Sequence, residues 1–220
     1  MKDSITAAGF VLEAVPSGEY DKRLVILTKE LGKITAFARG ARRANSSLLA
    51  AANPFTCGEF VLIEGKTAYS LIKVNNAEYF NEIAAMDPGV YYGYYFLELA
   101  KAYGQENLFG GDIVNLIYVA LRALIKNVIP VKLIKAIYEC RIMMINGDFY
   151  WNENDGMSEA AAYAFRFVSD CKVTSLFSFN LSREVFIEFE ERIEMRIYQI
   201  FGGRFKTLKV LRAVDAVNVD

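Results

Sequence analysis

Four cationic side chains gather in the stretch GKITAFARGARRANSS, which runs from residue 32 to residue 47. They are Lys33, Arg39, Arg42 and Arg43. No Asp or Glu occurs from Leu31 to Gly58, although the whole chain of 220 residues has a formal net charge of only -1. Since no carboxylate lies near in sequence to neutralise these cations, they predict contact with an anionic partner.

The residues around these cations fit a strand with two different faces, because side chains alternate along a strand. One face carries Lys33, Thr35, Phe37 and Arg39. The other carries Ile34, Ala36 and Ala38, which we expect to point into the protein. The outer face therefore interleaves an aromatic ring with cations, a pattern that binds single-stranded nucleic acid through phosphate contacts and base stacking. Gly40 then turns the chain, and Arg42 and Arg43 continue the charge into a loop.

Other interpretations of the same residues stay open. A run of exposed cations is usually a solvated protein surface that binds nothing. Phe37 could pack under the following loop instead of against a base, if a bulge in the barrel turns it inward. The absence of carboxylates over this stretch favours an anionic partner but does not exclude these alternatives.

The elements that must position this strip are short strands in the first 80 residues. Runs rich in β-branched or aromatic residues occur at 6–15, 23–30, 33–39, 59–64 and 67–74. Turn-forming glycine, proline and asparagine separate these runs. Five short strands in so small a region predict a closed β-barrel, because closure removes the exposed edges of a sheet.

After Asp87 the apolar residues recur at the spacing of a helix. We expect helices to begin at Asp87-Pro88, Asp112, Pro130, Ser158 and Ser182, which are residues suited to a helix start. The last of these helices has one apolar stripe, formed by Phe186, Phe189, Ile193, Ile197 and Ile200. The sequence therefore predicts an α+β chain, with a barrel domain at residues 1–80 and an all-α domain at residues 81–220.

The composition argues against several kinds of chemistry. The chain has no histidine, and its three cysteines are far apart, so neither a disulfide framework nor the usual zinc or Ser-His sites are expected. A GxxxxGK[ST] nucleotide motif is missing, so we expect no cofactor and no enzymatic activity. The start of the chain lacks the apolar run of a signal peptide, which favours a cytoplasmic protein.

The segment from residue 9 to residue 62 resembles the opening of the RecO family of bacterial DNA repair and recombination mediators. The resemblance rests on an ordered series: GxVL, a GE-D pair, LTxxxGKxxxxAxGAR, an S-L step and PFxxxEF. The segment GGRFKTLKVL, residues 202–211, is also similar to the family's closing segment. The helical middle of the chain matches the family only in layout.

This resemblance implies an N-terminal five-stranded OB-fold and a helical C-terminal domain. It implies binding of single- and double-stranded DNA, annealing of complementary strands, and a partnership with RecR and single-strand-binding protein that helps to load RecA. It also implies a cytoplasmic, nucleoid-associated location. The family's basic OB surface would correspond here to Lys33, Arg39, Arg42 and Arg43. The strand pattern, and not the resemblance, adds Phe37 as a stacking platform. Glu19 and Asp21 of the GE-D pair are expected to shape a turn, since no convergent catalytic partners are identifiable.

A second basic group lies near the end of the chain. It consists of Arg204, Lys206, Lys209 and Arg212, with no Asp or Glu from Phe201 to Val214. These cations could pair with the acidic helix before them, extend the DNA path, or bind the acidic tail of single-strand-binding protein. The sequence does not choose between these roles.

The chain departs from many RecO proteins in the region 146–171, where they carry a CxxC…CxxC zinc module. Here that region has a single cysteine, so no structural zinc is expected. Phe149, Tyr150 and Trp151 are expected to form a hydrophobic plug there, or else an exposed partner site.

Two alternatives to a DNA mediator are an adaptor of the repair machinery with little DNA affinity, and a nuclease that holds magnesium with Asp and Glu.

Overall fold

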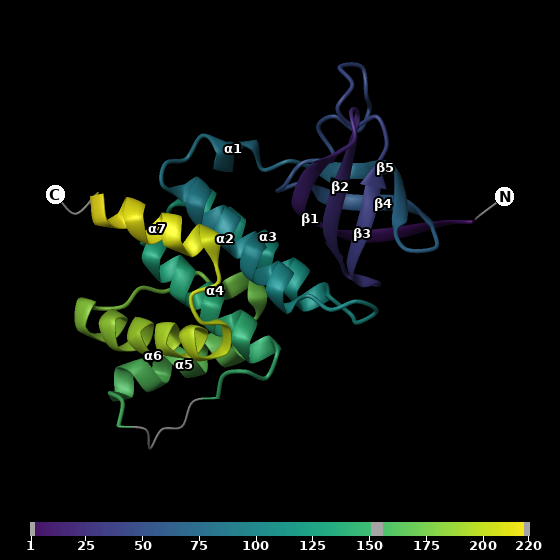
Figure 1. Ribbon diagram of the computed structural model, residues 1–220. Coiled ribbons are helices and arrows are strands. Elements are labelled where there is room, and N and C mark those ends of the chain that lie inside the picture. The colour runs from purple at the N-terminus through teal and green to yellow at the C-terminus, as the bar shows by residue number, and fades with distance from the viewer. Residues whose placement is uncertain (1–2, 151–155, 218–220) are drawn as a thin grey trace. The chain divides into compact units, whose positions relative to one another are not determined.

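The computed structural model describes residues 3–150 and 156–217, which form two compact units (Figure 1). The barrel unit contains residues 1–84 and 97–114. The helical unit contains residues 85–96 and 115–220. The division into a barrel domain at residues 1–80 and a helical domain at residues 81–220 stays a prediction.

The barrel unit is built on a closed five-stranded barrel with the strand order β1-β2-β3-β5-β4. The strands are β1 (Ser4–Ser17), β2 (Asp21–Thr28), β3 (Gly32–Ala38), β4 (Cys57–Glu64) and β5 (Tyr69–Glu78). All neighbours pair antiparallel except β3 and β5, which pair in parallel. The predicted five-stranded OB-fold is therefore confirmed.

The interior of the barrel follows the alternation expected for β3. Ile34, Ala36 and Ala38 point inward and are buried in one apolar core with residues from the other strands. The connection from β3 to β4 adds Ala41 and Ala52 to the same core. This burial fixes the loop that follows Arg39 against the end of the barrel.

Residues 97–114 cover part of the outer surface of β2 and β3. A Cβ atom at Gly104 would lie 3.0 Å from Leu27 Cδ1, and one at Gly110 would lie 2.4 Å from the Thr28 carbonyl oxygen. At Gly110 only a residue without a side chain allows this approach, because the nearest atom belongs to the backbone. The backbone amide of Lys33 also donates to the Gln105 carbonyl at 2.8 Å, so this segment is hydrogen-bonded to β3.

Helices follow the barrel strands along the chain. They are α1 (Asn81–Ala84), α2 (Gly89–Tyr103), α3 (Gly111–Lys126), α4 (Val131–Ile145), α5 (Glu159–Asp170), a short 3₁₀ helix at Val173–Ser175, α6 (Arg183–Phe201) and α7 (Lys206–Val217). No helix in the described residues is long and apolar enough to span a membrane. The three cysteines are free thiols.

Two of the predicted helix starts are confirmed by hydrogen bonds. Ser158 Oγ accepts from the Ala161 amide at 3.2 Å at the start of α5, and Ser182 Oγ accepts from the Val185 amide at 3.4 Å at the start of α6. The apolar stripe of α6 faces the core, because its central members Phe189, Ile193 and Ile197 are buried.

The other three helix starts differ from the prediction by one or two residues. Pro88 lies before α2 instead of at its first position, and the Val90 amide donates to the Met86 carbonyl, at 2.7 Å. Asp112 lies inside the first turn of α3, and Pro130 is the residue that caps α4. Proline has no amide hydrogen, so it fits any of the first positions of a helix, where no amide donor is needed. The sequence therefore does not determine at which of these positions the proline lies.

Candidate nucleic-acid interface

The three arginines after β3 lie on one loop, which is held against the turn between β1 and β2. We call residues 39–43 the basic loop. The Arg42 amide donates to the Tyr20 carbonyl at 2.9 Å, and Arg42 Nη1 donates to the Gly18 and Glu19 carbonyls at 3.2 Å and 3.0 Å. Asp21 accepts from the Gly40 amide at 2.7 Å. The basic loop is therefore positioned by several hydrogen bonds from a neighbouring turn, and Asp21 has the structural role expected of it.

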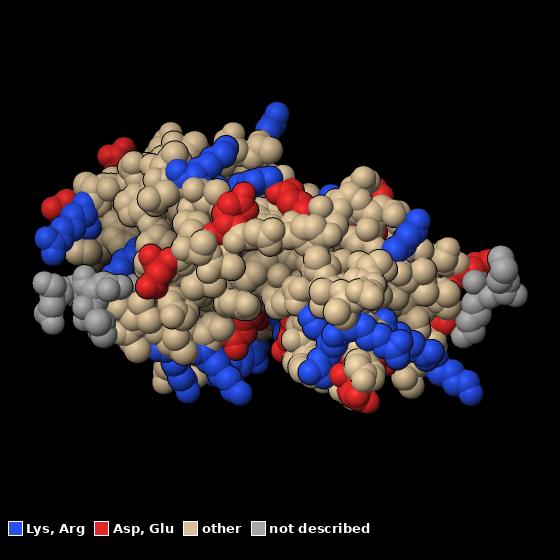
Figure 2. Space-filling view, turned by 90° about the horizontal axis from the view of Figure 1, so that it is seen from above, with Lys and Arg blue, Asp and Glu red and all other residues tan. Residues whose placement is uncertain are grey.

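The positive charges of the basic loop face solvent. Arg39, Arg42 and Arg43 are all exposed, and within the described part of the chain none of them forms an ion pair with a carboxylate. The Arg43 guanidinium lies over the Tyr20 ring, 4.8 Å from its centroid. Figure 2 shows Lys and Arg side chains close together over the barrel unit, toward the right of the view. The basic loop thus concentrates positive charge on three side chains that form no ion pair within the described chain, while Asp21 binds its backbone at Gly40.

Lys22 adds to this positive surface, although the sequence pattern did not single it out. Its Nζ donates to the Ala52 carbonyl at 3.0 Å and to Asn53 Oδ1 at 2.6 Å. Burial, together with the nearby positive charge of Arg42, lowers the pKa of Lys22. The β2–β3 hairpin pairs Lys22 with Ala38, directly before the basic loop. Recognition of this hairpin in the sequence would have indicated Lys22.

Lys33 lies apart from the three arginines. It is at the opposite end of β3 from Arg39, and six residues of extended strand separate the two by about 20 Å. Lys33 Nζ donates to the Lys101 carbonyl at 3.0 Å. Closeness in sequence therefore did not bring all four predicted cations together.

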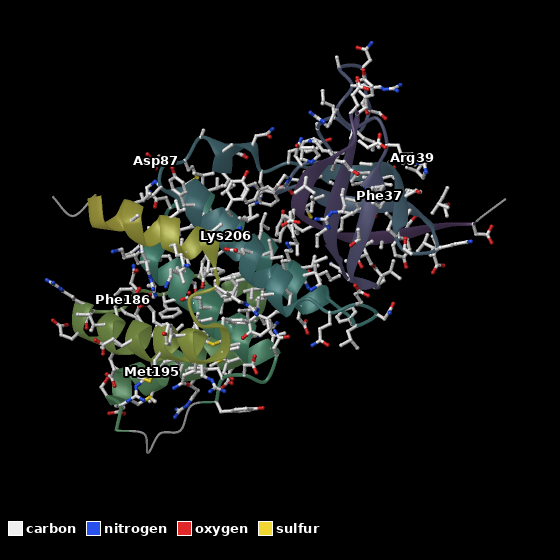
Figure 3. All side chains as sticks on the ribbon, in the orientation of Figure 1. Phe37, Arg39, Asp87, Phe186, Met195 and Lys206 are labelled. Carbon is white, nitrogen blue, oxygen red and sulfur yellow. The ribbon has the colours of Figure 1, made fainter. Side chains whose placement is uncertain are left out.

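Phe37 points outward from β3, as the alternation predicted, and is half-buried. Figure 3 shows it on the barrel, close to Arg39 along the chain. Its partner across the sheet on β2 is Arg23, whose Nη2 lies 3.3 Å from Glu13 Oε1. Glu13 also binds Lys101 Nζ at 2.5 Å. The cation across the sheet from Phe37 is therefore already paired with a carboxylate.

The second basic group, here called the terminal cluster, has a different environment. Arg204, Lys206, Lys209 and Arg212 are exposed side chains around the start of α7, where Figure 3 labels Lys206. The Arg204 guanidinium lies 4.4 Å from the centroid of the Phe201 ring. Arg212 Nη2 lies 3.8 Å from Glu194 Oε2 on α6, so part of the cluster pairs within the chain.

A buried ion network lies next to the terminal cluster in the helical unit. Lys135 Nζ is 3.0 Å from Glu139 Oε2 and 3.1 Å from Glu194 Oε1, and the Tyr95 hydroxyl donates to Glu139 at 2.6 Å. Burial opposes the charge of Lys135, but the two carboxylates outweigh it and raise the pKa of Lys135. Glu194 thus serves both the buried lysine and the exposed Arg212.

Phe149 and Tyr150, in the region where many RecO proteins carry a zinc module, have different environments. The Phe149 ring stacks on Phe165 at 5.3 Å, in agreement with a plug, whereas Tyr150 is 84% exposed. Trp151 lies outside the described residues. Among the residues that the structure describes, no three His, Cys, Asp or Glu side chains are grouped to hold a metal ion.

Comparisons with known proteins give a consistent result. Residues 1–80 match the family described as Recombination protein O N terminal. The chain is 35% identical to the DNA repair protein RecO of Alkaliphilus metalliredigens over 65% of its length, and 33% identical to that of Caldicellulosiruptor saccharolyticus over 66%. These matches span only 58% and 59% of the two relatives. The RecO of Acetivibrio thermocellus is 24% identical over 97% of this chain and 98% of its own length.

Proposed function

Because the chain belongs to the RecO family, we propose that it is a mediator of DNA repair and homologous recombination. In this role it binds single- and double-stranded DNA through the basic loop of its OB-fold. It acts by binding and not by catalysis, at the bacterial nucleoid.

One observation carries the proposal: Arg39, Arg42 and Arg43 are exposed together and have no carboxylate partner within the described residues. DNA phosphates would provide the missing negative charge, and their counterions would be released on binding. Neutralisation of one strand also lowers its repulsion of a second strand. The same loop therefore supports annealing of complementary strands.

Partner proteins complete the proposed role. RecR and single-strand-binding protein would cooperate with this chain to load RecA on coated single strands. Lys209 and Arg212 line a pocket of about 60 Å³ together with the apolar Leu208 and Phe205 and the acidic Glu139 and Glu194. The exposed cations at its rim, and not the pocket itself, are therefore the proposed contact for the acidic tail. A labelled tail peptide of single-strand-binding protein should bind roughly tenfold more weakly to the Lys209→Glu/Arg212→Glu variant.

The decisive experiment is a salt series with a labelled single-stranded oligonucleotide. Each phosphate contact contributes about 0.7 to the slope of log affinity against log salt for a single strand, so Arg39→Ala/Arg42→Ala/Arg43→Ala should reduce the slope by about 2. The matched control is Lys29→Ala/Lys66→Ala/Lys73→Ala, which removes the same charge elsewhere on the barrel unit. Equal slopes in the two variants would contradict a DNA-binding role for the basic loop. Weak, salt-independent binding by the wild type would instead favour an adaptor.

A further inference from the structure

Tyr20 is an aromatic residue placed among the uncompensated cations, at the turn between β1 and β2. Its side chain is 43% exposed, and the Arg43 guanidinium lies 4.8 Å from the centre of its ring. Its backbone carbonyl accepts the Arg42 amide at 2.9 Å, so the main chain at Tyr20 is fixed to the basic loop. The ring is therefore held beside the cations while remaining accessible.

We propose that Tyr20 is the stacking platform for an unpaired base and that it gives the basic loop a preference for single-stranded over duplex DNA. This inference rests on the proposed function, because it assumes that the basic loop binds phosphates. A duplex offers phosphates to the arginines, but its bases are already stacked on one another. Only an unpaired base can therefore use the tyrosine ring.

The environment of Tyr20 suits this role better than that of Phe37. Phe37 is half-buried on the sheet, and the neighbouring Arg23 already pairs with Glu13. Tyr20 is next to Arg42 and Arg43, which have no such carboxylate partner in the described chain. A base on Tyr20 would thus have free cations beside its own phosphate.

The contact with Arg43 shows how the ring would be used. A planar guanidinium over an aromatic ring occupies a position that a planar base can also take. When a base stacks there, Arg43 moves off the ring and pairs with the adjacent phosphate. A side-chain hydrogen bond with Glu19 raises the pKa of Tyr20 and places the Glu19 carboxylate at the hydroxyl edge of the ring, so the ring face is the part that a base would use.

The test compares three labelled probes of equal length: an oligo-dT strand, a strand with abasic sugars at its central positions, and a duplex. Stacking of one base on an aromatic ring contributes about 1–3 kcal/mol, so Tyr20→Ala should weaken oligo-dT binding by about 5-fold to 150-fold. Abasic-strand and duplex binding should change by less than about twofold, because neither probe offers a base to the ring. Tyr20→Phe should bind all three probes like the wild type.

Tyr79→Ala is the matched control, because Tyr79 is also an exposed tyrosine of the barrel unit, at 37% exposure. Its neighbour Glu78 pairs with Cys57, which pairs with Phe10, and Phe10 is about 20 Å along β1 from the Tyr20 turn. Tyr79→Ala should bind all three probes like the wild type and keep the preference for the oligo-dT strand over the abasic strand.

Two outcomes would overturn the inference: an unchanged oligo-dT affinity in Tyr20→Ala, or an equal loss with all three probes. A Tyr20→Leu variant covers the case in which Tyr20→Ala melts at a lower temperature, since leucine keeps bulk but offers no ring. The failure of the proposed function looks different. In that case the wild type itself would bind none of the probes in a salt-dependent manner.

Discussion

The basic loop and the terminal cluster have nearly the same sequence pattern, cations without an acid nearby, but the fold gives them different partners. In the basic loop, Arg42 donates to backbone carbonyls and Arg43 lies over a neutral ring. In the terminal cluster, Arg212 lies 3.8 Å from Glu194, which also binds the buried Lys135. Carbonyls and rings position a cation without cancelling its charge, whereas a carboxylate does cancel it.

A run of cations in a sequence therefore indicates a binding surface only when the residues that contact it in the fold are known. The arginine side chains of the basic loop form no ion pair within the described chain and can bind an outside anion, whereas the helical unit compensates part of its own charge. We therefore expect substitutions in the helical unit mainly to lower the free energy of unfolding. Substitutions in the basic loop should mainly weaken DNA binding.

The largest effect is expected from Glu139→Ala in the buried network. It would leave the Tyr95 hydroxyl without its acceptor and Lys135 with Glu194 as its remaining carboxylate, so the free energy of unfolding should fall by about 3 kcal/mol. Urea or thermal unfolding measures this loss, and Glu191→Ala, an exposed glutamate of the same unit, is the control. A loss below about 1 kcal/mol would mean that the network contributes little.

The next effect separates the two basic groups directly. Removing three cations from the basic loop should weaken single-strand binding by about 10-fold to 100-fold at moderate salt. Removing three from the terminal cluster, as Arg204→Ala/Lys209→Ala/Arg212→Ala, should change the salt slope by less than about 0.5. Similar slopes for both variants would show that the two groups share one DNA path, and the comparison would fail.

A smaller effect tests positioning against charge. Asp21 accepts from the Gly40 amide at 2.7 Å, so Asp21→Ala should lower the free energy of unfolding by about 1–2 kcal/mol and weaken DNA binding a few-fold. Asp21→Asn keeps an acceptor and removes the negative charge, so it should bind DNA as well as the wild type or slightly better. Tighter binding by Asp21→Ala would show that charge alone governs this surface.

The smallest effect is expected from Arg212→Ala. Its side chain is 60% exposed and its nitrogen is 3.8 Å from Glu194, so the pair should stabilise the helical unit by less than about 1 kcal/mol. Thermal unfolding at low and high salt measures this contribution. A much larger loss would show that Arg212 belongs to the buried network of Lys135.

The sequence by itself determined the local features of this protein. The alternation of Ile34, Ala36 and Ala38 predicted the inner face of β3, and the turn signals predicted five strands. Periodicity also predicted the buried stripe of α6, and the motifs from residue 9 to residue 62 indicated the resemblance to the RecO family, whose N-terminal model matches residues 1–80. These features depend on neighbours a few residues apart, which a sequence displays directly.

Which of the cations lie together, and which residues contact them, follows only from the tertiary structure. The length of β3 separates Lys33 from Arg39, while hairpin pairing brings Tyr20 and Lys22 beside the basic loop. The pairing of Arg212 with Glu194 depends on how α7 meets α6. The charge left on a side chain depends on residues distant in sequence, because electrostatic interactions follow distances in space.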